Sequence, residues 1–183
     1  MIMDGLLLLD GSVSSAGTFS GTAVNSGTTF TSGAATSSAN IIDVSQLASS
    51  AKGYGRDIAI GEALELVVMV TTPFTGSSST LQVQLQYAPD GGSGTPGSFV
   101  TVAQSIAYAL SALTAGAELL RIKLPPMTPS PATGSAMVKF IQTNYVVGTA
   151  NMTAGAIAAF IVLDKTALGP GLGYQSGYSN QYL

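Results

Sequence analysis

Short segments with the period of a β-strand recur from residue 41 to residue 164, and clusters of glycine, proline and serine separate them. The clearest is TLQVQLQYA at 80–88, where apolar residues alternate with Gln82, Gln84 and Gln86. A period of two places successive side chains on opposite faces of a strand. About eight such segments, spaced roughly 8–20 residues apart, predict an all-β fold: an antiparallel β-sandwich or jelly roll.

The boundaries of these segments follow from their composition. The predicted strands are IIDV (41–44), ELVVMVTTPF (65–74), TLQVQLQYA (80–88), FVTVAQSIAYAL (99–110, as one or two strands), LLRIKL (119–124), MVKFIQTNYVV (137–147) and AIAAFIVLD (156–164). Pro73 is expected to end the second of them, because proline lacks a backbone N–H group. Turns are expected at 76–79, 89–98, 113–118 and 148–155, and a loop at 125–135. One weak helical candidate lies at 45–54.

Three regions differ in composition. Residues 41–168 hold the strand pattern and are expected to form the sandwich core. Residues 1–40 contain a short apolar strand and then a stretch of Gly, Ser, Thr and Ala, which suits either a flexible loop or an extended arm that pairs with a neighbour. Residues 169–183 form a Gly- and Tyr-rich tail.

The tail carries Tyr174, Tyr178 and Tyr182 at intervals of four residues. Glycine and serine make a helix unfavourable here. We therefore predict an extended tail whose rings dock into pockets on a neighbour, since tyrosine gives a large contact area at low entropic cost. The alternative is a disordered terminus. By contrast, Tyr54, Tyr87, Tyr108 and Tyr145 lie in or beside strand patterns and are expected to be packed.

The chain has few charged residues. They make up 8% of the sequence, against about 25% in a typical soluble domain, while hydrophobic residues reach 46%. The apolar runs are far shorter than the ~20 residues that span a bilayer, so no membrane span is expected. Because interface cores are depleted in charge, this composition predicts a homo-oligomer whose surface is largely buried against other chains.

Several function classes are disfavoured by what the sequence lacks. It has no histidine and no cysteine, which removes the commonest general base, the commonest metal ligand and the thiolate nucleophile. We therefore expect no enzyme, cofactor or metal site. Glu62 and Glu65 are close in sequence, but a turn residue and an outward strand residue explain them better than a glycosidase pair. Six scattered basic residues and a net charge of −3 argue against nucleic-acid binding.

The N-terminus, MIMDGLLLLDG, carries an acid at Asp4 and no basic region before its apolar run. It is therefore not a convincing secretory signal, and synthesis in the cytoplasm is expected.

The polar face of residues 80–88 holds three glutamines and no charge. Glutamine donates and accepts hydrogen bonds without the cost of burying a charge. Gln82, Gln84 and Gln86 are therefore candidates for contact with another protein. The alternative is an ordinary solvent face.

Several stretches together carry a resemblance to a known family. They are MDGLLLLDG (3–11), GRDIAIGEALELVVMVTTPF (55–74), TLQVQLQYAPDG (80–91), LTAGAELLRIKLP (113–125), YVVGTANMTAGAIAAFIVLD (145–164) and GYQSGY (173–178). In order and spacing, the chain resembles the jelly-roll capsid cement (decoration) proteins of tailed bacteriophages, the group typified by the Bordetella podophage cement protein. The segment at 12–39 and the loop at 125–136 are longer than the family's equivalents, and the following strand lacks expected arginines.

The resemblance implies a structural virion protein. Such a protein binds the outside of an HK97-fold shell of major capsid protein, bridges capsomers as a dimer or trimer, and is located on the capsid surface. The alternative is a secreted or cell-surface β-sandwich binding module. No motif supports an enzyme.

Overall fold

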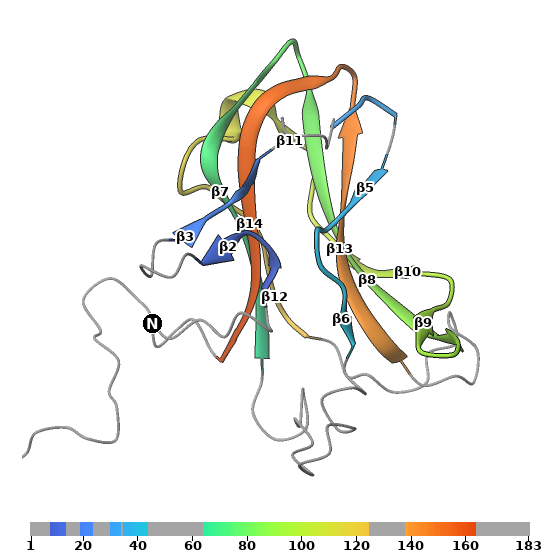
Figure 1. The fold of residues 1–183 in the computed structure, drawn as a ribbon. Helices are drawn as coiled ribbons and strands as arrows, with labels where there is room; N and C mark the ends of the chain where they lie inside the picture. The colour runs from blue at the N-terminus through green and yellow to red at the C-terminus, as the bar shows by residue number, and fades with distance from the viewer. Residues whose placement is uncertain are drawn as a thin grey trace, which may run out of the picture.

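A computed structural model describes residues 8–13, 19–23, 30–33, 35–43, 64–124 and 138–163. Two antiparallel sheets face each other across a shared core (Figure 1). The all-β sandwich predicted from the strand pattern is therefore confirmed. Outside the described residues lie the helical candidate at 45–54, Tyr54, Glu62, the loop at 125–135 and the tail at 169–183.

The strands divide between two main sheets and one small hairpin. The first sheet has the order β1 (Leu8–Asp10), β14 (Met152–Leu163), β7 (Leu64–Gly76) and β12 (Glu118–Lys123), with β4 (Thr22–Ala23) beside β14. The second sheet has the order β10 (Val100–Gln104), β8 (Thr80–Gly92), β13 (Val138–Gly148) and β5 (Ala35–Ser37). Three short strands join this sheet: β6 (Ile42–Asp43) pairs with β13, whereas β9 (Thr95–Pro96) and β11 (Tyr108–Ala109) pair with β8. β2 (Ser12–Val13) and β3 (Phe19–Ser20) form the hairpin, and a 3-10 turn, η2, spans Leu110–Ala112.

The pairing order is that of a jelly roll. β1 pairs with β14, β5 and β6 pair with β13, β7 pairs with β12, and β8 pairs with β10. The chain thus pairs from its two ends inward, as a two-stranded ribbon that rolls up into two sheets. The centres of the sheets are the long pairs β7–β14 and β8–β13. Parts of residues 1–40 belong to these sheets: β1, β4 and β5 all pair within the chain.

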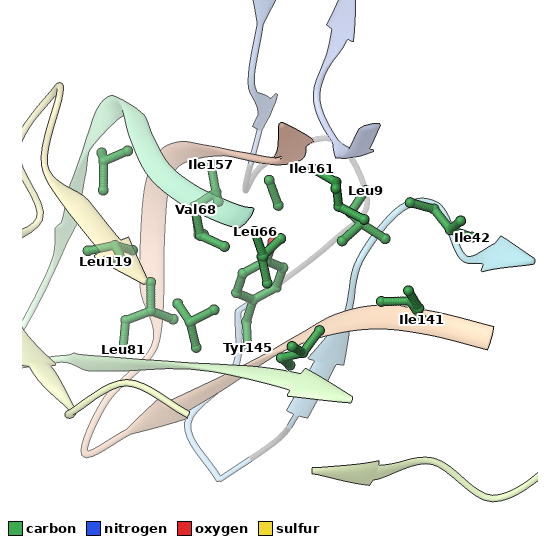
Figure 2. Close-up of a cluster of buried hydrophobic side chains, with 14 of the residues drawn as sticks. Leu9, Ile42, Leu66, Val68, Leu81, Leu119, Ile141, Tyr145, Ile157 and Ile161 are labelled. Atoms are coloured by element: carbon green, nitrogen blue, oxygen red, sulfur yellow. The ribbon is translucent and has the colours of Figure 1, made fainter. Parts of the chain in front are cut away.

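The core lies between the two sheets, where alternate residues point inward. Leu66, Val68 and Val70 of β7 are fully buried, and Leu81, Val83 and Leu85 of β8 face them from the second sheet. Figure 2 shows side chains of this cluster pointing toward one another from both sheets. Tyr87 and Tyr145 are buried and Tyr108 packs against the core, as predicted.

Three predicted strand boundaries were wrong. β14 begins at Met152, within the turn predicted at 148–155. β7 continues through Pro73 to Gly76, because Pro73 is exposed and the pairing of β7 with β14 is interrupted by bulges in this region; proline is tolerated at such irregular positions. β8 continues past residue 88 to Gly92 and turns at Ser93–Gly94 into β9. In β14, Gly155 has φ +137, and a Cβ there would lie 2.5 Å from the ring of Phe74.

Candidate interaction surfaces

Five amide side chains lie together on the outer face of the second sheet. Gln82, Gln84 and Gln86 point outward from β8, because Leu81, Val83 and Leu85 point into the core. On β13, Gln142 lies opposite Gln86, and Asn144 lies opposite Gln84. We call Gln82, Gln84, Gln86, Gln142 and Asn144 the amide face.

The side chains of the amide face bond to one another and to the neighbouring strand. Gln84 Oε1 accepts from Asn144 Nδ2 at 2.9 Å, and Gln86 Oε1 accepts from Gln142 Nε2 at 2.8 Å. Gln86 Nε2 lies 3.2 Å from Thr101 Oγ1, and Gln82 Nε2 donates to the Ser105 carbonyl at 2.9 Å. These bonds run across β13, β8 and β10 and stabilise their pairing.

The network changes the interpretation of the three glutamines. They are partly exposed, whereas Gln142 and Asn144 are 4% and 6% exposed. The absence of charge on this face therefore has an explanation within the chain, since buried amides that bond to one another need no solvent. Contact of the amide face with another protein stays a prediction. Gln142 and Asn144 were missed in the sequence, although the period of two in FIQTN places both on one face.

A buried carboxylate joins the two sheets at one edge. Asp10 of β1 is 2% exposed, and its Oδ2 accepts from Tyr145 Oη at 2.5 Å and from Thr143 Oγ1 at 3.3 Å. Its Oδ1 accepts from the Ala39 N–H at 2.9 Å. Next to it, Asn40 donates from Nδ2 to the Leu8 carbonyl at 3.1 Å. Asp10 thus links β1 of the first sheet to β13 of the second.

Two buried tyrosines, Tyr145 of this edge and Tyr87 of β8, have raised pKa values. Burial, and then the negative charge of Asp10, raise the pKa of Tyr145 well above its usual value. Burial likewise raises the pKa of Tyr87. Both hydroxyls therefore stay protonated at physiological pH, and Tyr145 is a permanent donor to Asp10. This arrangement links the strands through the hydrogen bond between Tyr145 and Asp10.

The outer face of the first sheet is apolar. A second buried cluster, distinct from the core, is formed there by Leu8, Val67, Met69, Ala158, Phe160 and Val162. We call these six residues the outer apolar cluster. Beside it, Glu65 points outward as predicted, and its Oε2 accepts from Arg121 Nε at 2.9 Å. The side chain of Glu65 is 8% exposed, so the ion pair explains how an acid is tolerated there.

Other features of the described residues bear on function. No group of three or more histidine, cysteine, aspartate or glutamate side chains comes together there as a metal site would require. None of the described helices has the length and apolar character to cross a membrane. The tyrosines Tyr174, Tyr178 and Tyr182 lie outside the described residues.

The comparison with known families adds an independent observation. A family model named Bbp16 matches residues 24–161. The chain belongs to the Bbp16 family. The name indicates a protein of a Bordetella bacteriophage. A search of curated proteins found no match.

The Bbp16 match covers most of the sandwich but not all of the features described above. The amide face lies wholly within the matched residues. Asp10 of the edge network and Leu8 of the outer apolar cluster lie before it, and the tail tyrosines lie after it.

Proposed function

We propose that this chain is a capsid cement protein that binds the outer surface of a bacteriophage shell and bridges neighbouring capsomers. The observation that carries the proposal is the Bbp16 match across the jelly roll, because it associates this fold with a bacteriophage. The resemblance to phage cement proteins, described from the sequence, supplies the finer role. The partner is the major capsid protein of an HK97-fold shell.

The proposed mechanism is linkage without chemistry. A protein that binds the assembled shell and not its dissociated subunits stabilises the shell by mass action. An oligomer that touches two capsomers gains further, since its second contact forms at high effective concentration. We propose a homo-oligomer, a dimer in preference to a trimer, located on the virion surface.

The low charge content predicts how this linkage responds to salt. Only 8% of the residues are charged, so few ion pairs can cross the interface. Contacts that depend on ion pairs weaken as salt shortens the Debye length, to about 3 Å at 1 M. Uncharged contacts are not screened in this way. Stabilisation by this protein should therefore persist at high salt.

The direct test measures the melting temperature of shells with and without the purified protein, at low salt and at roughly 1 M NaCl, where screening is strong. The expected result is a higher melting temperature at both salt concentrations. A wild-type protein that leaves the melting curve unchanged at low salt would overturn the proposal.

Two sets of variants locate the contacts. If the amide face touches the shell, Gln82→Glu, Gln84→Glu or Gln86→Glu should weaken binding, because each would bury a charge. If the tail tyrosines dock on a neighbour, removal of residues 170–183 should weaken assembly and leave the sandwich folded. Normal shell binding by the glutamate variants would assign the amide face to solvent.

A further inference from the structure

Among the residues that the structure describes, one end of the sandwich contains no charged side chain. Four segments meet there: Phe30–Gly33, Thr71–Thr80, Ser105–Ala117 and Gly148–Thr153. We call these segments the uncharged end, which includes the turns between β7 and β8 and between β13 and β14 (upper part of Figure 1). Glu118, next along the chain, marks its boundary.

Hydrogen bonds hold the four segments together. Ser79 Oγ donates to the Asn151 carbonyl at 3.0 Å, and the Ser32 N–H donates to Asn151 Oδ1 at 2.8 Å. The N–H of Phe74 donates to the Leu113 carbonyl at 3.0 Å, and the rings of Phe30 and Phe74 meet edge to face below. The uncharged end is therefore a preformed surface, which lowers the entropic cost of binding.

The opposite end of the sandwich carries ion pairs. Lys139 Nζ donates to Asp90 Oδ2 at 2.6 Å, and the charge of Asp43 also acts on Lys139. Lys123 lies opposite Glu65 near the start of β7. Charge is thus distributed unequally between the two ends of one small fold.

The exposed residues of the uncharged end are small, with one exception. Ser77, Ala112 and Thr114 are typical of them. The exception is Ile106, which lies between β10 and β11 and is 71% exposed, the most exposed large hydrophobic residue of the described chain. Ile106 follows Ser105, whose carbonyl accepts from Gln82, so the uncharged end is continuous with the amide face.

These properties match a surface that becomes buried. Burial of a charge is costly, and the centres of protein interfaces are depleted in charged residues. Small side chains also lose little rotamer entropy when they are fixed. An isoleucine that projects from such a surface supplies apolar area that gains from leaving water.

We propose that the uncharged end is the surface with which this protein seats on the shell, and that the opposite, charged end faces solvent. This inference rests on the proposed cement function. The fitting partner is a charge-poor protein surface that offers hydroxyl and backbone groups, with an apolar recess for Ile106.

The test compares charges introduced at the two ends. Ser77→Glu, Thr114→Glu and Ile106→Lys change exposed residues of the uncharged end, and Ser98→Glu is the matched control at the charged end, near Pro89. Co-sedimentation with shells should show binding weakened by about tenfold or more in the first three variants, because each buries an unpaired charge. The control should bind like wild type, and thermal melts should show all four variants folded.

The outcomes separate the two proposals. A wild-type protein that does not sediment with shells would overturn the cement function, and this inference with it. A wild type that binds, together with three variants that bind equally well, would overturn only the inference. Light scattering without shells adds a third outcome: a wild-type dimer that the same variants dissociate would assign the uncharged end to self-association and overturn the inference.

Discussion

The two sheets of this sandwich have similar inner faces and contrasting outer faces. Outside the first sheet, the outer apolar cluster packs around Val67 and Phe160. Outside the second sheet, the amide face bonds side chain to side chain across β8 and β13. Both outer faces contain residues that are less than 9% exposed, such as Val67 and Gln142.

The difference shows that burial alone does not determine the chemistry of an outer face. Apolar side chains on a sheet are held by contact area, whose free energy grows with the surface removed from water. Buried amide side chains are held by hydrogen bonds to partner groups. Removal of one partner leaves the other without a hydrogen bond, and this lowers the free energy of unfolding. The two faces should therefore respond differently to equivalent truncations.

The largest effect is expected from Phe160→Ala in the outer apolar cluster. Phe160 is 7% exposed, and removal of a buried phenyl ring lowers the free energy of unfolding by about 3 kcal/mol. Urea denaturation measures this loss. The control variant, Phe160→Leu, keeps most of the apolar volume, and its free energy of unfolding should fall by clearly less than that of the alanine variant. A loss below about 1 kcal/mol for the alanine variant would mean that this cluster is not packed like a core.

A second variant tests polar groups that lie deeper than the amide face. Tyr145→Phe removes one donor from Asp10 and should lower the free energy of unfolding by about 2 kcal/mol, because a buried carboxylate would lose a hydrogen bond. Thr143 and the Ala39 N–H still donate to Asp10, which limits the loss. Equal stability of wild type and variant in urea would argue against a structural role for this bond.

A smaller effect is expected on the amide face. Gln142→Leu removes the donor to Gln86 Oε1 and should cost about 1 kcal/mol, since Gln86 is partly exposed and water can replace the lost donor. The control is Gln104→Ala, because the amide contact of Gln104 with Gln84 is 3.5 Å long. Chemical denaturation of this variant should show almost no change in the free energy of unfolding. If Gln142→Leu cost as much as Phe160→Ala, the contrast between the outer faces would fail.

The smallest effect is expected for the ion pair at the charged end. The hydrogen bond from Lys139, and then the one from the Gly92 N–H, lower the pKa of Asp90, while Asp90 raises the pKa of Lys139. The contribution of the Asp90 carboxylate to the free energy of unfolding is therefore present at neutral pH and is lost as the pH falls through its lowered pKa. The contribution of the Lys139 ammonium group to the free energy of unfolding is lost as the pH rises through its raised pKa.

Because the side chain of Asp90 is exposed and that of Lys139 is partly exposed, solvent screens the pair, and Lys139→Met should leave the melting temperature at pH 7 nearly unchanged. Melts of wild type and variant across the acid range should converge below the pKa of Asp90. A difference that grows as the pH falls would contradict this assignment.

Much of the fold could be predicted because strand periodicity is local. The alternation of residues 80–88 gave β8 and the correct inward face, and the serine cluster gave the turn at 76–79. The turn predicted at 148–155 was too long, because β14 already begins at Met152. The continuation of β7 through Pro73 could not be predicted, since it depends on bulges opposite β14.

The interaction surfaces were less predictable because they depend on distant partners. Asp10 appears in the sequence as a lone acid after a run of leucines, and its hydrogen-bond partner Tyr145 lies 135 residues away. Likewise, the amide face needs the register between β8 and β13 before Gln142 and Asn144 join the three glutamines. The local sequence shows that these polar residues are unusual for their positions. Only the pairing of distant strands shows which groups they bond to.

The pairing of β1 with β14 also has a consequence for biosynthesis. Leu8 lies opposite Phe160, so β1 is synthesised well before the strand with which it pairs. At typical synthesis rates the wait is on the order of ten seconds, and during it β1 has no strand to pair with. Folds with such distant contacts also form slowly once the chain is complete. Until β14 emerges, the unpaired edge of β1 is therefore a site at which nascent chains are prone to aggregate.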